Sequence, residues 1–219
     1  MCKAPLLFVL LFCTSGISQS QQPPRAVVVD KMVATVNGEL VTYTDVLWQL
    51  ALQPKTVLDN TSTQTLETAL QLVIDQRLIM QEAEKLPSIS PTDKELEAEL
   101  TALVKLFPSQ AEFEQRARRV GLDAARLREI VERRVRVEKY LDFRFRNFVV
   151  ITQKEIADYY KDVYVPRLRR QSPGLIVPKL DDVRAQIEQT LSESKVESDI
   201  ASFLDGARER AEITILTPL

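Results

Sequence analysis

The sequence contains no histidine among its 219 residues, and this absence excludes several classes of enzyme. Histidine is the usual general base near neutral pH and a frequent zinc ligand. Ser-His-Asp triads, Cys-His nucleophiles and the HExxH zinc motif are therefore excluded. The five glycines are too few for a loop that cradles phosphates, and neither GxGxxG nor GxxxxGK[ST] occurs. The sequence thus predicts no catalytic residue, no cofactor and no metal.

The composition that remains is that of a folded, globular protein. Hydrophobic residues make up 45% of the chain and charged residues 27%, with a net charge of −2. The length suffices for one large domain or two small ones, and for a hydrophobic core.

The first 22 residues have the order of a secretory signal peptide. Lys3 precedes the apolar run 6–13, which small and polar residues follow. The run is too short to cross a bilayer as a helix. A lipoprotein signal at Cys13 is a weaker alternative, because the residue before that cysteine is bulky. Cys2 and Cys13 both lie in the segment to be removed, so we expect an exported protein without disulfides.

Two short β-compatible runs, 32–36 and 39–42, flank Asn37-Gly38. Asn-Gly is the pair that a type I′ turn prefers, so a β-hairpin is predicted. The alternating run 212–216 predicts one more strand. Because an isolated hairpin is marginal in water, we expect the C-terminal strand to pair with it.

Between these strands, apolar residues recur at helical spacing and capping signals mark where helices begin. We expect caps at Thr44-Asp45, Ser90, Ser109, Asp123 and Thr152. The predicted helices cover about residues 44–52, 63–85, 91–107, 109–121, 123–146, 152–161 and 179–211, the last with at most an interruption near 192–194.

Residues 163–178 interrupt this helical pattern. They contain three prolines, a glycine and the basic cluster Arg167, Arg169 and Arg170, without clear periodicity, so they predict an exposed connection. The predicted fold class is therefore mostly α, with a small antiparallel β-sheet formed by the N-terminal hairpin and the C-terminal strand.

Several segments resemble, in the same order, the SurA-like periplasmic chaperones. The likeness extends over residues 28–162 and, more weakly, 179–216. Its motifs are VVDKMVATVNGELVT (28–42), TDV (44–46), LVIDQRLIMQEA (72–83), ISPTDKEL (89–96) and VITQKEI (150–156).

The chain departs from that family where a parvulin-type prolyl isomerase domain usually follows. That domain has roughly a hundred residues, and residues 163–178 are too few to form it. Parvulin sites also typically use histidines, which are missing here. The resemblance thus implies the chaperone module alone, without isomerase activity. Its expected divisions are a signal peptide (1–22) and a single chaperone domain (28–219) made of a helical module (28–162), a linker (163–178) and a C-terminal helix and strand (179–219).

The family also implies what the protein binds, namely unfolded outer-membrane or other exported polypeptides held in an apolar groove. Apolar residues at helical spacing are usually core residues, but large ones at a surface mark binding sites. Phe143 and Phe145 are two apart on one helix, so at least one should be exposed. The candidate client-binding residues are Trp48, Met80, Phe107, Phe113, Phe143, Phe145 and Phe148.

Other interpretations stay open at this stage. Residues 116–146 hold eleven Lys/Arg against five Asp/Glu. Because an exported protein does not meet nucleic acid, we expect no nucleic-acid partner for this basic segment. Its charges are explained instead by a solvated helix face or by transient contact with an anionic membrane surface. Three further alternatives remain. The protein is a scaffold with one fixed partner in the envelope, or a homodimer with swapped strands. The third is an enzyme, either one that uses Asp181 and Asp182 or one related to prolyl isomerases.

Overall fold

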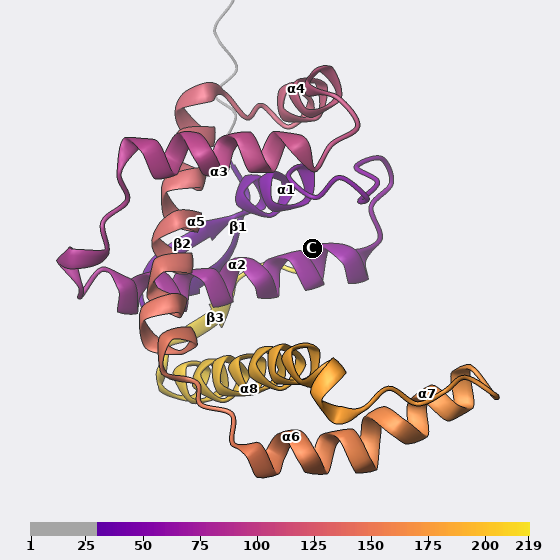
Figure 1. Ribbon diagram of the computed structural model, residues 1–219. Coiled ribbons are helices and arrows are strands. Elements are labelled where there is room, and N and C mark those ends of the chain that lie inside the picture. Colours follow the sequence, from indigo (N-terminus) through magenta and orange to yellow (C-terminus); the bar gives the residue numbers. More distant parts are fainter. Residues whose placement is uncertain (1–29) are drawn as a thin grey trace, which may run out of the picture.

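Helices account for most of residues 30–219, the part of the chain that the computed structural model describes (Figure 1). The predicted signal peptide, residues 1–22, lies outside the described residues. Within those residues, no helix combines the length and the apolar character needed to cross a membrane. The elements in chain order are β1 (Met32–Val36), β2 (Glu39–Thr42), α1 (Tyr43–Ala51), α2 (Thr63–Ala83), the 3-10 turn η1 (Pro87–Ile89), α3 (Asp93–Lys105), α4 (Gln110–Arg119), α5 (Ala124–Arg144), the 3-10 turn η2 (Arg146–Phe148), α6 (Gln153–Tyr159), the π-helical turn η3 (Tyr160–Tyr164), α7 (Val165–Gln171), α8 (Leu180–Arg210) and β3 (Ile213–Ile215).

The three strands form one antiparallel sheet in the order β2-β1-β3, so the predicted sheet from both chain ends is confirmed. Asn37 and Gly38 form the hairpin turn with φ angles of +51° and +83°, as a type I′ turn requires. Asn37 also reaches the C-terminal segment. Its backbone N–H donates to the carbonyl of Glu212 at 2.8 Å, and its side-chain oxygen accepts from the Glu212 N–H at 2.9 Å.

The main core lies where the sheet packs against α1 and α2. Val33 and Val36 of β1, Val46 of α1 and Ile74 of α2 are each at most 1% exposed. Burial of side chains of this size is the main favourable contribution to folding. The N-terminal hairpin therefore depends on the helices that follow it.

Helix α8 is a single unbroken helix that runs beneath the body of the protein (Figure 1). It contributes to three hydrophobic clusters in succession, through Ile187, Val196 and Ala207. Near its C-terminal end, Arg208 donates to both carboxylate oxygens of Asp75 on α2, at 2.9 and 2.6 Å. This bidentate ion pair holds α8 against α2 beside the sheet.

Three of the predicted caps, Ser109, Asp123 and Thr152, accept the expected backbone hydrogen bonds. Two predictions were wrong. Helix α1 is capped by Thr42, whose side chain and that of Asp45 form a reciprocal capping box. Helix α3 is capped by Thr92 rather than Ser90, because Thr92 and Glu95 form a reciprocal capping box while the Ser90 hydroxyl donates to the carbonyl of Pro87.

The prediction of an irregular linker over residues 163–178 was also wrong in part. Helical turns continue through η3 and α7 to Gln171, and only residues 172–178 are irregular. Pro166 lies in the first turn of α7, where no backbone N–H is needed, so it does not break the helix. We call residues 153–178 the arm. Its far end, with α7, projects from the body at the lower right of Figure 1.

Two glycine substitutions should affect stability in opposite directions. Gly38→Ala puts a side chain on a left-handed backbone and should lower the free energy of unfolding by about 1–2 kcal/mol. Gly206 lies inside α8, where an added Cβ meets only the flexible end of Arg210 at 3.2 Å. Gly206→Ala should raise stability by up to about 1 kcal/mol through helix propensity. Urea unfolding of both variants measures this, and a destabilised Gly206→Ala would contradict the unbroken α8.

Candidate functional site

A cavity of about 810 Å³ lies between α1, α2, α3 and α5. We call it the four-helix cavity. Its size is within the range of small-ligand pockets in proteins, roughly 300–1,000 Å³. Apolar and charged side chains both line it: Asp45, Trp48, Gln49, Leu52, Val73, Gln76, Arg77, Met80, Glu95, Ala98, Glu99, Ala102, Ile130, Arg133, Arg134, Val135, Val137, Glu138 and Lys139.

Two of the predicted client-binding residues, Trp48 and Met80, line this cavity together. Both are half-buried, and Trp48 also packs against the core cluster that contains Phe107 and Phe113. The ring nitrogen of Trp48 donates to the carbonyl of Val120 at 3.1 Å, which fixes the orientation of the indole. Together with Ile130 on α5 they provide an apolar wall.

Three other predicted client-binding residues are core residues, and for these the prediction was wrong. Phe107, Phe113 and Phe145 are each at most 8% exposed. The rings of Phe107 and Phe113 meet edge to face at 5.2 Å, and Phe145 packs in the same manner on Phe203 of α8 at 5.5 Å. Packing of aromatic rings against each other accounts for these residues without a client.

The last two predicted residues, Phe143 and Phe148, are 48% and 71% exposed, but neither lines the four-helix cavity. The expectation that Phe143 and Phe145 could not both be buried is confirmed. Phe148 lines a different depression of about 650 Å³ between the end of α5 and α8, beside Phe203 and Arg210. The seven predicted residues therefore do not form one site.

Sequence reasoning missed the residues that open the cavity. Ala98 and Ala102 lie one turn apart on the exposed side of α3, and their small side chains leave the space unfilled. Arg77 of α2 also reaches the cavity, and its guanidinium lies 3.8 Å from Asp45 and 3.7 Å from Glu39. The alternation of small and charged residues on α3 was the signal available for this site.

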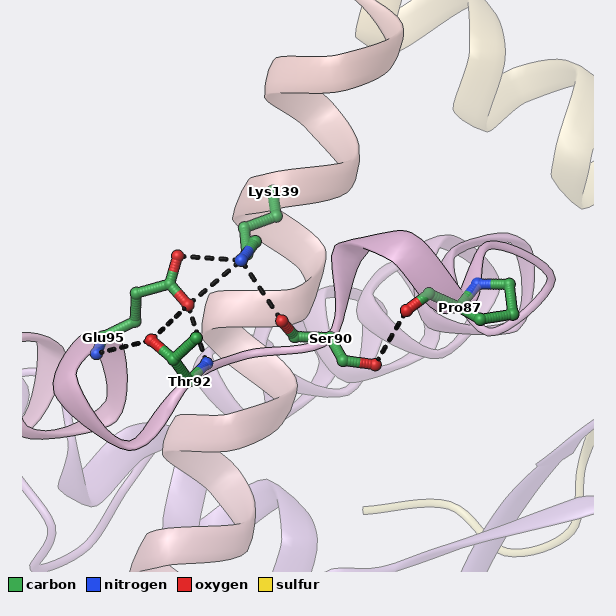
Figure 2. A network of polar contacts seen from close by, with 5 residues as sticks. All are labelled: Pro87, Ser90, Thr92, Glu95 and Lys139. Carbon is green, nitrogen blue, oxygen red and sulfur yellow. Dashed lines mark hydrogen bonds and ion pairs between the residues drawn. The ribbon is translucent and has the colours of Figure 1, made fainter.

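Ion pairs brace the side of the cavity formed by α3 and α5. Arg134 of α5 donates to Glu99 of α3 at 3.1 Å. Lys139 donates to both carboxylate oxygens of Glu95, at 2.8 and 3.0 Å, and to the carbonyl of Ser90 (Figure 2). These contacts hold the first turn of α3 against α5, and thereby set the width of the cavity.

Glu95 is held in its charged form by this network. The hydrogen bond from Lys139 is the largest cause, and the backbone and hydroxyl of Thr92 add to it. Together they lower the pKa of Glu95 from the ordinary 4.5 to about 2. Figure 2 shows the donors converging on this one carboxylate. A carboxylate with such a low pKa is a poor general base near neutral pH.

Arg133 on α5 also lines the cavity, and its charge is less well compensated. It forms no hydrogen bond or ion pair with the side chains of residues 30–219 for which contacts are described. Burial is the main cause that lowers its pKa, and the neighbouring Arg77 lowers it further. The cavity thus combines an apolar wall with a cation whose charge is poorly compensated by nearby acids.

No protein-family model matches the chain, and no curated protein is similar enough to count as a relative. In the described part of the chain, no group of three or more potential metal-ligand side chains is found. The cavity is therefore interpreted from its own residues.

The Glu95 network makes a testable prediction about titration. Since its pKa is depressed, Glu95 stabilises the fold above the unfolded value of 4.5, and this contribution is lost as the pH falls from there toward about 2. In Lys139→Met, the carboxyl resonance followed by NMR should titrate at a clearly higher pH. Glu155, whose pKa is lowered mainly by the backbone of Thr152, serves as the internal control and should barely move. An unchanged Glu95 titration would show that Lys139 is not its principal partner.

Proposed function

We propose that the protein is a periplasmic chaperone that binds unfolded segments of outer-membrane or other exported proteins in the four-helix cavity, without catalysing a reaction. The observation that carries the proposal is the cavity itself. Half-buried Trp48 and Met80 and the aliphatic Ile130 face a space large enough for several side chains. The resemblance of residues 28–162 to SurA-like chaperones adds the class of client.

The chemistry of the wall suits varied clients rather than one rigid ligand. Methionine is flexible and polarizable, so Met80 can adapt to side chains of different shape. Tryptophan offers a large apolar face at little cost in conformational entropy. Around this wall, the paired charges Arg134–Glu99 and Lys139–Glu95 keep the rim polar.

The acidic residues that were considered for catalysis have structural roles that suffice to explain them. Asp182 accepts from the backbone N–H of Lys179 at the start of α8, where acids are favourable. Asp181 pairs with Arg184 one turn away. These contacts favour a binding protein over the enzyme alternative.

Filling the cavity should abolish client binding. Ala102→Arg places a long side chain into the space from an exposed helix position, so the fold should tolerate it. We expect this variant to lose most of the ability to prevent aggregation of an unfolded outer-membrane protein diluted from urea, as followed by light scattering. Ala201→Arg, an exposed position on α8 outside the cavities described, is the matched control and should behave as wild type.

Two other results would revise the proposal. Full protection by Ala102→Arg together with loss in Phe148→Ser would move the client site to the depression beside α8. Recovery of a single stoichiometric partner from envelope extract, instead of many precursors, would favour the scaffold alternative.

The arm supports a second proposal, that the protein makes transient contact with an anionic membrane surface. Within the arm, residues 163–178 contain three arginines and no acid, although the whole chain has a net charge of −2. Leu175 and Ile176 near the end of the arm are 61% and 90% exposed. Basic residues around exposed apolar side chains are typical of segments that dock on anionic lipid.

Vesicle sedimentation tests this contact. The triple variant Arg167→Gln, Arg169→Gln and Arg170→Gln should bind anionic phosphatidylglycerol vesicles at least tenfold more weakly, because each basic residue near such a surface contributes about 1 kcal/mol. The control removes the same charge from the body, by glutamine at Arg118, Arg126 and Arg128, and should retain most of the binding. Equal losses in the two variants would show that net charge, and not the arm, determines the contact.

A further inference from the structure

The four-helix cavity contains one cation whose charge is not matched locally. Its charged lining is Asp45, Glu95, Glu99 and Glu138 against Arg77, Arg133, Arg134 and Lys139. These numbers balance, but the pairing does not, because Glu138 bonds to Arg146, which is not part of the lining. Arg133 is the cation left over.

The other cavity cations have described partners. Lys139 bonds to Glu95, and Arg134 bonds to Glu99. Arg77 lies within 4 Å of Asp45, which also serves in the capping box of α1. Two acids act on Arg133, but both have other partners: Asp45 lies near Arg77 and caps α1, and Glu129 bonds to Arg126.

A half-buried guanidinium beside a second one is unfavourable, since burial removes water and the like charges repel. Both effects act on Arg133 and lower its pKa. An entering carboxylate would reverse both, because it is negative and its two oxygens match the planar fork of a guanidinium. The apolar wall of Trp48, Met80 and Ile130 lies in the same cavity.

We infer that Arg133, with Arg77 beside it, binds a carboxylate of the client segment while Trp48, Met80 and Ile130 contact its neighbouring apolar side chains. This inference rests on the proposed function and narrows it. The preferred ligand is a peptide with a carboxylate next to large apolar residues. The carboxylate is supplied either by the C-terminus of the client or by an Asp or Glu side chain.

The single tryptophan of the chain provides the measurement, since Trp48 lines the cavity. Three tryptophan-free peptides with the same apolar sequence are titrated against wild-type protein. One has an amidated C-terminus and no acid, one has a free C-terminus, and one is amidated with an internal glutamate. At least one of the two carboxylate peptides should bind about tenfold or more tightly than the neutral peptide. The difference between these two peptides shows whether a C-terminal or a side-chain carboxylate is preferred.

Arg133→Gln should remove this preference, so that the peptides with and without a carboxylate bind with similar affinity. Arg118→Gln, which removes one positive charge from the exposed surface of α4 and does not line the cavity, is the matched control and should keep the preference. Arg133→Lys should keep part of it, because a charge remains without the planar fork. Urea unfolding of each variant confirms that the fold is retained.

The outcomes separate the inference from the proposed function. If wild type binds all three peptides equally, or if Arg133→Gln retains the preference, the carboxylate site is wrong while client binding stands. If no peptide changes Trp48 fluorescence and filling the cavity leaves protection against aggregation intact, the proposed function is wrong and the carboxylate site falls with it.

Discussion

The pairing of β3 with β1 is the contact on which the arrangement of the helices depends. It aligns Val36 with Ile213 and Ala34 with Ile215, residues that are far apart in the chain. Because α8 runs directly into β3, the pairing also places the end of α8 beside α2, where Arg208 and Asp75 complete the contact. Without it, the hairpin would be a two-stranded sheet of marginal stability.

The cavity is a consequence of how the helices above this sheet are braced. Arg116 of α4 donates to four carbonyls at and just after the end of α1, which ties α4 to α1. Glu95 and Lys139 tie the start of α3 to α5. With α1 and α3 anchored at their ends, the small side chains of Ala98 and Ala102 leave space that no other described residue fills.

The proposed functions use two chemically different regions. The four-helix cavity offers an apolar wall with one under-compensated cation, which suits a peptide carrying a carboxylate. The arm offers exposed apolar side chains among arginines, which suits a charged surface.

The elements themselves were largely predictable, because their signals are local. The turn at Asn37-Gly38 depends on backbone preference, and the caps at Ser109, Asp123 and Thr152 depend on hydrogen bonds that span three residues. Where two local signals overlapped, as at Ser90 and Thr92, the sequence alone did not decide between them. The helix α7 was missed because prolines and arginines masked its short pattern.

The sequence by itself determined the fold class, the sheet from both chain ends and most helix boundaries. Only the tertiary structure decided which aromatics are buried. Phe145 and Phe148 have similar sequence surroundings, yet Phe203 of α8 covers the first and leaves the second 71% exposed. It also decided where the cavity lies, since its lining comes from four helices. Burial and unfilled space depend on neighbours distant in the chain, which a local pattern does not specify.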